Sequence, residues 1–215
     1  MSNSKFNRRA LLAGTASVAG LAALPALPAN ADVSQQAVFN SVAHWGARSP
    51  NGTPRVIWSR PNKIIIHHTV YPNTTDYSVA QAYRHARQVQ NLHMNSNGWI
   101  DTGYNFIVSR GGHCTEGRTG SLPRMEAGSA FIQGAHTAGQ NAQSIGIAAE
   151  GSYHTGAAIP GNQWGAMVVV CAYIMNKYNI PSSQIFGHQN YSATSCPGSW
   201  QQRLPQLRSA VNNVR

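Results

Sequence analysis

The chain has 215 residues, of which 42% are hydrophobic and 10% are charged, and its formal net charge is +10. This length supports one domain with a packed core and is short for two. The basic residues are scattered, without a cluster or interleaved aromatic residues, so the sequence carries no nucleic-acid-binding motif.

Residues 1–31 have the features of an export signal. Lys5 and the twin arginines Arg8 and Arg9 form a positive start, and an apolar stretch rich in Ala and Leu follows over residues 10–27. Ala29-Asn30-Ala31 matches the small-residue signature of a cleavage site. The arginine pair favours the twin-arginine export route. We therefore predict a signal peptide over 1–31 and a single secreted or cell-wall-associated domain over 32–215.

An uncleaved membrane anchor is the alternative interpretation of this segment. Pro25 and Pro28, just before the cleavage signature, favour cleavage, so we expect no stable membrane insertion. Loss of the three basic residues leaves 13 basic against 6 acidic side chains, a net charge of +7. Such a charge favours contact with wall polyanions, although it serves solubility equally well. We expect a monomer.

Apolar residues recur with the period of a strand in some segments and of a helix in others. We expect, in chain order, a short helix over 33–43, an irregular lead-in over 44–61, a buried strand over 63–68, a helix over 78–94, strands over 104–109 and 114–116, a loop over 117–137, a strand over 144–150, a helix over 164–178, a strand over 185–188, and a terminal helix over 200–214 that Pro205 interrupts. This alternation predicts an α/β fold, with a central mixed β-sheet of about five to six strands flanked by helices.

Two histidines and a cysteine are candidates for a metal site. His67 and His188 each end a predicted strand, and Cys196 lies in the loop closed by Pro197-Gly198. Imidazole and thiolate ligands suit Zn²⁺, and three protein ligands leave a fourth position open for catalysis. We therefore predict zinc in a cleft at one edge of the sheet.

Each histidine also has a simpler interpretation, as a hydrogen-bonded or exposed side chain without a metal. His68 follows His67 in the same strand and should point to the opposite face, so we expect it to be structural. The simpler interpretation is strongest for five other histidines, namely His44, His85, His93, His113 and His154.

The chain has three cysteines, and an odd number in an exported protein leaves one thiol unpaired. One consistent arrangement pairs Cys114 with Cys171 and leaves Cys196 for the metal. The sequence alone leaves this pairing open.

Several motifs occur in order from about residue 40 to residue 204. They are Trp45-Gly46-Ala47-Arg48, Ile64-Ile65-Ile66-His67-His68-Thr69, Gly98-Trp99-Ile100-Asp101-Thr102-Gly103-Tyr104-Asn105-Phe106, Glu116-Gly117-Arg118, Gly134-Ala135-His136-Thr137 with Asn141, Ser144-Ile145-Gly146-Ile147, and Gly187-His188 to Cys196-Pro197-Gly198. These motifs resemble those of peptidoglycan recognition proteins and, more broadly, are similar to those of the zinc amidases that include phage endolysins. Their order and spacing together make the resemblance specific.

The resemblance implies that His67, His188 and Cys196 bind zinc and that Tyr104 is catalytic. A phenol beside the metal can hydrogen-bond the attacking oxygen or the developing oxyanion, although a core aromatic residue is the alternative. Thr194 occupies a position where amidases among the recognition proteins often have threonine, so it is a second candidate catalytic residue.

The resemblance also bears on the substrate. We expect His136 and Asn141 to line a groove for peptidoglycan or muropeptides. Arg118 could meet a peptide carboxylate, although a solvated surface arginine is equally consistent. Glu150 is a candidate for a substitute base, but a structural role is favoured.

The function implied is that of a zinc-dependent N-acetylmuramoyl-L-alanine amidase. Such an enzyme hydrolyses the amide between the lactyl group of N-acetylmuramic acid and the L-alanine of the stem peptide. Two alternatives stay open: a recognition module that binds peptidoglycan without cleaving it, and a zinc peptidase that cuts within the stem peptide.

Overall fold

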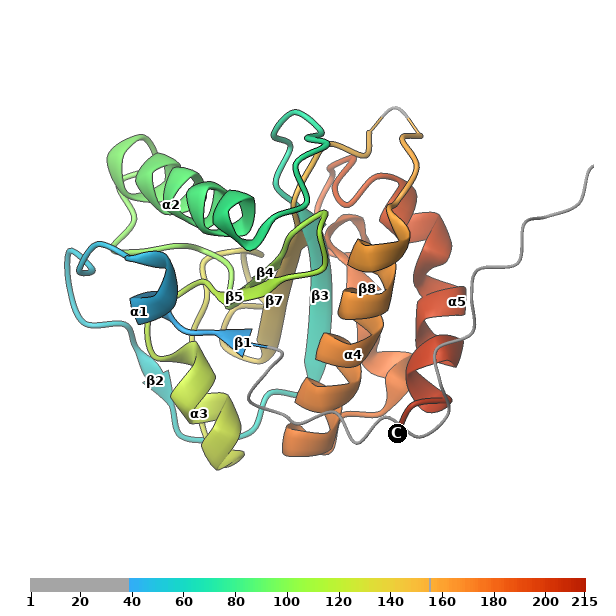
Figure 1. Cartoon of the computed structure of the whole chain (residues 1–215). Coiled ribbons are helices and arrows are strands. Elements are labelled where there is room, and N and C mark those ends of the chain that lie inside the picture. Colours follow the sequence, from blue (N-terminus) through green and yellow to red (C-terminus); the bar gives the residue numbers. More distant parts are fainter. Residues whose placement is uncertain (1–38, 155) are drawn as a thin grey trace, which may run out of the picture.

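A six-stranded mixed sheet forms the centre of the computed structural model, which describes residues 39–154 and 156–215 (Figure 1). The predicted signal peptide lies outside the described residues. The strand order is β1-β5-β4-β7-β3-β8, and every neighbouring pair is parallel except β4 and β5. The strands are β1 (Phe39–Asn40), β3 (Lys63–His68), β4 (Phe106–Val108), β5 (Cys114–Glu116), β7 (Ser144–Ala149) and β8 (Ile185–Gly187). The predicted fold class is therefore confirmed.

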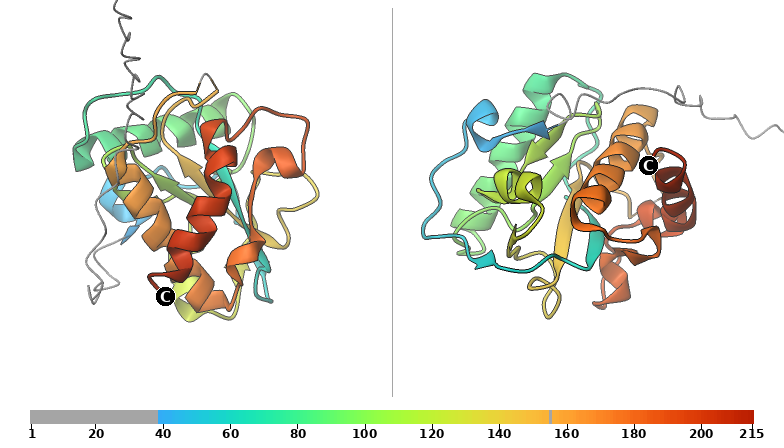
Figure 2. Two further views of the ribbon diagram at one scale, coloured as in Figure 1. Left: turned by 90° about the vertical axis from the view of Figure 1, so that its right-hand side faces the viewer. Right: turned by 90° about the horizontal axis from the view of Figure 1, so that it is seen from below.

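Within the part of the chain that the structure describes, five α-helices and a small second sheet surround this core (Figures 1 and 2). The second sheet pairs β2 (Val56–Ile57) with β6 (Phe131–Ile132) in antiparallel orientation. The helices are α1 (Val42–Trp45), α2 (Val79–Asn95), α3 (Ser121–Ala127), α4 (Gly161–Tyr178) and α5 (Ser199–Asn212), with 3₁₀ turns at Ser182–Gln184 and His188–Asn190. Within the described residues, none of the helices combines the length and apolar character that a membrane crossing needs.

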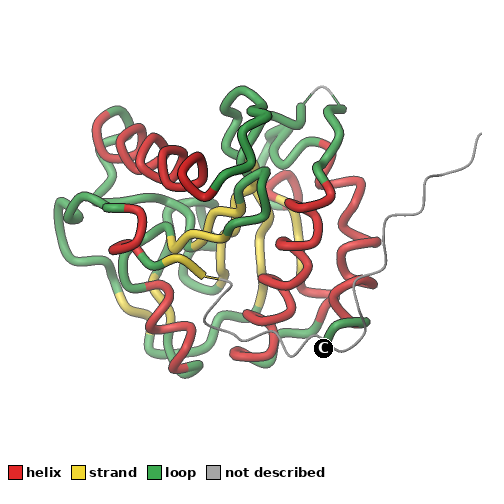
Figure 3. The backbone as a smooth tube through the Cα atoms, in the orientation of Figure 1, coloured by secondary structure: helices red, strands yellow, loops and turns green. Residues whose placement is uncertain are grey.

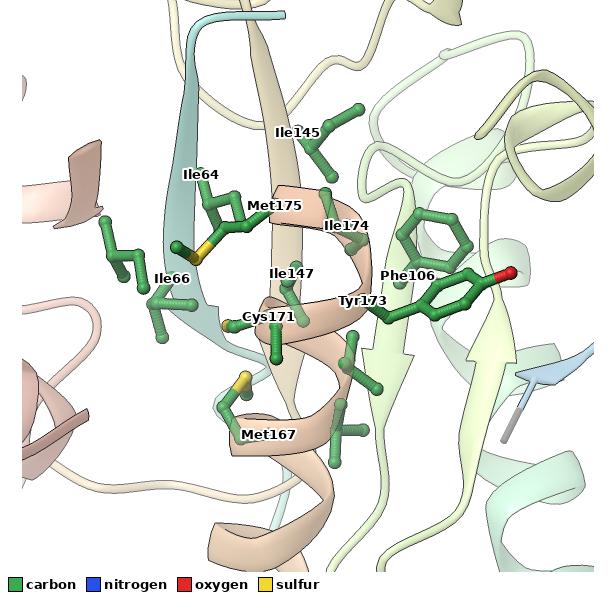
Figure 4. Packing of buried hydrophobic residues seen from close by; sticks show 14 of the residues in the cluster. Ile64, Ile66, Phe106, Ile145, Ile147, Met167, Cys171, Tyr173, Ile174 and Met175 are labelled. Atoms are coloured by element: carbon green, nitrogen blue, oxygen red, sulfur yellow. The ribbon is translucent and has the colours of Figure 1, made fainter. Parts of the chain in front are cut away.

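Successive side chains along β3 point to opposite faces of the sheet, and the two faces differ in polarity. Ile64 and Ile66 belong to the main hydrophobic cluster, which α4 supplies with Met167, Cys171 and other residues (Figure 4). His67 points to the other face, where its ring lies near that of Tyr104, which in turn contacts His93 of α2. The sheet thus has an apolar face beneath α4 and α5 and a more polar face toward α2.

Helix α2 follows its sequence signals closely. Ser78 caps the helix, because its Oγ accepts a hydrogen bond from the Gln81 backbone N–H. Ala82, Ala86 and Val89 are buried at helical spacing.

Three expectations about local structure are wrong. The described part of the predicted 33–43 helix begins with β1, a strand that pairs in parallel with β5, and only then turns into α1. The predicted loop over 117–137 contains α3 and β6. Both elements are too short to produce a hydrophobic period, and Pro123 within α3 reads as a helix breaker.

Helix α5 continues through Pro205 instead of being interrupted. Pro205 is exposed, so its ring lies on the solvent side of the helix, and only one hydrogen bond within the helix is lost. Trp200, Leu204 and Leu207 are buried at helical spacing, and this packing outweighs the local cost of proline.

The cysteine pairing suggested from the sequence is not formed. Cys114, Cys171 and Cys196 are all free and buried. Cys114 and Cys171 lie in the main hydrophobic cluster, and burial raises the pKa of both thiols. They behave as small apolar core residues.

Candidate active site

His67, His188 and Cys196 come together at the carboxyl ends of two neighbouring parallel strands. His67 is the second-last residue of β3, and His188 follows β8 directly. Ile66 pairs with Gly187 in the register of the two strands, so the residues that follow them are adjacent. One ligand atom from each of the three residues lies within 4.8 Å of the other two. The loops that follow these two parallel strands leave the sheet at the same end (Figure 3).

Cys196 is held against β3 by main-chain contacts. Its Sγ accepts a hydrogen bond from the His68 backbone N–H at 3.4 Å and lies 3.7 Å from His67 Nδ1. The Cys196 carbonyl accepts from the Gln189 N–H, which ties the loop back to the 3₁₀ turn. The thiol is therefore placed before any ligand binds.

The two nitrogens of His67 face different groups. Nδ1 faces Cys196, whereas Nε2 lies 3.1 Å from His136 Nδ1 and 3.3 Å from Thr137 Oγ1. With Nδ1 as the metal ligand, the proton resides on Nε2 and can be donated to His136. This arrangement is typical of a metal ligand whose second nitrogen is oriented by an outer partner.

His136 is suited to this accepting role. Burial, together with nearby His188, lowers the pKa of His136 to about 3, so the ring is neutral. The ring lies against two glycines, because a Cβ at either Gly134 or Gly146 would come within 2.4 Å of it. The absence of side chains at these positions creates the space that His136 occupies.

Tyr104 reaches the same site from the segment before β4. Its ring centroid lies 5.2 Å from that of His67. His93 Nδ1 accepts a hydrogen bond from the Gly103 N–H, and Asn105 Oδ1 accepts from the Gly146 N–H, so the residues on both sides of Tyr104 are fixed. Burial raises the pKa of Tyr104, and the phenol therefore stays protonated at neutral pH.

The donor set fits a zinc ion. Burial lowers the pKa values of His67 and His188, which favours the neutral imidazole that binds metals. Burial raises the pKa of Cys196 to about 11, so without a cation the thiol is protonated. A soft thiolate with two imidazoles is a zinc-type ligand set, and three ligands match a catalytic rather than a structural site.

The other predicted site residues are mostly engaged by the protein itself. The Thr194 hydroxyl accepts a hydrogen bond from the Cys196 N–H, so it adjoins the metal-ligand loop. Asn141 Oδ1 accepts from the backbone N–H groups of both His136 and Thr137. Arg118 is buried, and its guanidinium donates to three main-chain carbonyls, those of Asp101, Thr102 and Gln133.

Glu150 has a structural environment. Its carboxylate accepts hydrogen bonds from the Gln81 side chain and the Arg110 backbone, and it lies 3.7 Å from His85 Nδ1. Because Glu150 is buried, we expect Glu150→Ala to lower the free energy of unfolding by about 3 kcal/mol, mainly through the partners it leaves unpaired. Urea unfolding measures this loss. A Glu150→Gln protein that folds stably but loses hydrolysis a hundredfold would instead assign Glu150 a catalytic role.

His93 predicts a pH dependence of stability. Burial, with a contribution from Arg118, lowers its pKa to about 4, while the unfolded chain takes up this proton near pH 6.5. Between these values the unfolded state binds more protons, so stability falls as the pH is lowered from about 6.5 to about 4, by up to about 1.4 kcal/mol per pH unit. We expect His93→Gln to flatten this dependence in chelator-treated protein, measured by urea unfolding at several pH values. An unchanged slope would contradict the assignment.

Two residues of the site were not singled out from the sequence. Thr137 contacts both His67 and His136, and its only signal was its place next to His136. His93 was expected to be an ordinary buried or exposed histidine, and its position on the buried side of α2 gives no hint of the Gly103 contact.

Comparison with known proteins points in one direction. A family model described as N-acetylmuramoyl-L-alanine amidase (Amidase_2) matches residues 57–199. Peptidoglycan-recognition protein SC1a of Drosophila melanogaster is 35% identical over 162 residues, 74% of this chain and 79% of that protein. The N-acetylmuramoyl-L-alanine amidase of Homo sapiens is 30% identical over 160 residues, 72% of this chain and 25% of that protein.

Solved structures agree with these sequence relatives. One holds tracheal cytotoxin, a monomeric diaminopimelic acid-type peptidoglycan, bound to the ectodomain complex of peptidoglycan recognition proteins LCa and LCx. It is similar to this chain with a TM-score of 0.65 and 30% identity, over 75% of this chain and 90% of that one.

Proposed function

The chain belongs to the N-acetylmuramoyl-L-alanine amidase family, and from this premise we propose that it is itself a zinc-dependent amidase. Its substrate would be the amide between the lactyl group of N-acetylmuramic acid and L-alanine in peptidoglycan. The observation that carries the proposal is the convergence of His67, His188 and Cys196 within 4.8 Å, beside the partly buried Tyr104. A module that only binds peptidoglycan has no need for this set of donors.

The three donors would hold the ion and leave a coordination position free. Zinc bound there would supply Lewis-acid polarisation of the scissile carbonyl and a lowered pKa for a water molecule. His136 and Thr137 would keep the His67 ring in one orientation and one tautomer, because both lie within 3.3 Å of its Nε2.

Tyr104 and Thr194 would supply hydrogen bonds to the reacting groups. The Tyr104 phenol is protonated and can donate to the oxygen that gains negative charge as the carbonyl carbon becomes tetrahedral. The Thr194 hydroxyl already accepts from the Cys196 N–H, so its own hydrogen is available to a second acceptor. The residues on either side of Tyr104 and the Thr194 hydroxyl are already hydrogen-bonded within the protein, which lowers the cost of reorganisation.

The remaining predicted residues would shape the substrate groove. The His136 ring, which packs over Gly146, would form part of its floor, and Asn141 would fix the loop that carries His136. Arg118 would support the groove indirectly, because its guanidinium donates hydrogen bonds to the carbonyls of Thr102 and Gln133. We also propose that the mature domain acts outside the cell on wall muropeptides, in keeping with the predicted export signal.

Digestion of a purified muropeptide tests the proposed function. We expect the zinc-loaded protein to release an intact stem peptide whose new amino terminus is L-alanine, identified by mass spectrometry. Chelation should stop this release, and added Zn²⁺ should restore it. Binding without any release would instead identify a recognition module, and a new amino terminus within the stem would identify a peptidase.

A further inference from the structure

A second surface feature lies away from the metal ligands, between the β2 segment and α3. It is a cavity of about 330 Å³. Apolar side chains dominate its lining, which consists of Pro54, Val56, Thr119, Gly120, Pro123, Arg124 and Ile132. Thr119 Oγ1 has no hydrogen-bond partner among the described residues, so one polar group of the lining is unused.

An exposed tryptophan adjoins this cavity. Pro54 and Val56 line it, and Trp58 follows directly after β2. The Arg124 guanidinium lies 4.9 Å from the centre of the Trp58 ring, which confirms that Trp58 flanks the cavity. With 76% of its surface exposed, Trp58 offers an aromatic face to solvent. An exposed indole face beside an apolar cavity can be covered by a carbon-rich group of a ligand.

Two arginines give this surface a positive charge. Arg124 lies in α3, and Arg60 donates from its Nε to the carbonyl of Gly128, just after the same helix. The ion pairs of the described residues involve Arg84, His85 and Lys177, so no carboxylate neutralises Arg60 or Arg124.

We propose that Trp58, Arg60, Arg124 and the adjoining cavity form a binding site for an anionic polymer with phosphodiester-linked polyol or sugar units. The carbon-rich unit would pack on the Trp58 ring and in the apolar cavity, as ring faces and apolar walls favour C–H groups. The Arg60 and Arg124 guanidinium groups would bind phosphates of the polymer. The charge of the protein then acts through a defined surface, in addition to its general attraction to polyanions.

This site would hold the protein at the polymer and would take no part in hydrolysis. Its residues come from the β2 segment and α3, whereas the metal ligands come from β3 and from the segment after β8. The inference goes beyond the proposed amidase activity, because a polymer without peptide would bind here. It gives the protein a hold on the wall while the groove is empty.

Calorimetric titration of the full-length, zinc-loaded protein with a synthetic glycerol-phosphate oligomer tests the proposal. We expect Arg124→Gln and Trp58→Ala each to raise the Kd about tenfold or more. Arg124→Gln should also make the binding less dependent on salt, because one phosphate contact is lost. Thermal unfolding verifies that each variant is folded, and the exposure of Trp58 makes a large loss of stability unexpected.

Arg203→Gln is the matched control, since it removes the same charge from an exposed position on α5. It should change the Kd less than about twofold. Equal weakening by Arg203→Gln and Arg124→Gln would overturn the proposal, because net charge alone would then explain the binding. No binding, or equal binding of an uncharged oligosaccharide, would overturn it as well. The oligomer has no scissile amide, so these outcomes are independent of the muropeptide digestion.

Discussion

Replacement of Cys196 by serine is expected to lower the hydrolysis of muropeptides by at least about a hundredfold. The buried thiol lies 3.7 Å from His67 Nδ1 and supplies the only soft donor of the three. A serine hydroxyl is a poor zinc ligand, and the charge stabilisation that the ion gives is worth several kcal/mol. Each 1.4 kcal/mol corresponds to a factor of about ten in rate. Metal content by mass spectrometry and initial rates on one muropeptide measure the two effects together.

Cys171→Ala provides the control for this substitution. It also removes a buried free thiol, but from the core-facing side of α4. We expect normal metal content and normal hydrolysis, with a modest loss of stability. If Cys196→Ser kept both zinc and full activity, the three-donor site would not be the catalytic centre.

The second large effect is expected for Tyr104→Phe. Loss of the hydroxyl should lower kcat by about a hundredfold to a thousandfold, the usual cost of one hydrogen-bond donor to an oxyanion. KM should change little, because the aromatic ring beside His67 and His93 stays in place. Steady-state kinetics on a defined muropeptide, with zinc content measured in parallel, separates this effect from loss of the metal.

Tyr104 also predicts how activity depends on alkaline pH. Burial and the nearby Cys196 raise the pKa of Tyr104 above its ordinary value, so this phenol should not cause a loss of activity below about pH 10. Tyr77→Phe, at an exposed tyrosine, should behave like the unmodified protein. A Tyr104→Phe protein with normal kcat would leave Tyr104 as a structural aromatic residue.

Elements with a clear local pattern of residues, such as strand β3, were predictable from the sequence. The β-branched run over β3 predicted the strand with its correct bounds, and its last residues placed His67 and His68 on opposite faces. The structure agrees, because His68 Nδ1 accepts from the Tyr153 N–H on the apolar side while His67 faces Tyr104. The motifs also predicted that the three candidate metal ligands share one site, and their ligand atoms lie within 4.8 Å of one another.

Features that depend on packing were not predictable. The β2–β6 pair has two residues in each strand, and it forms only because the chain brings these segments together. The contact of His136 with His67 depends on empty space above Gly134 and Gly146, which no periodic pattern records. Arg118 was expected at the surface or at a substrate carboxylate, but its contacts to main-chain carbonyls depend on the fold around it.

The order of the donors along the chain has a consequence for biosynthesis. His67 is made early, but its two partners lie after residue 185, and β8 must first pair with β3 to bring His188 into place. A nascent chain still attached to the ribosome with its last thirty residues unfolded therefore holds one donor and no complete site. On the proposed function, a product that ends before Cys196 would lack a complete metal site, so we expect it to have no amidase activity.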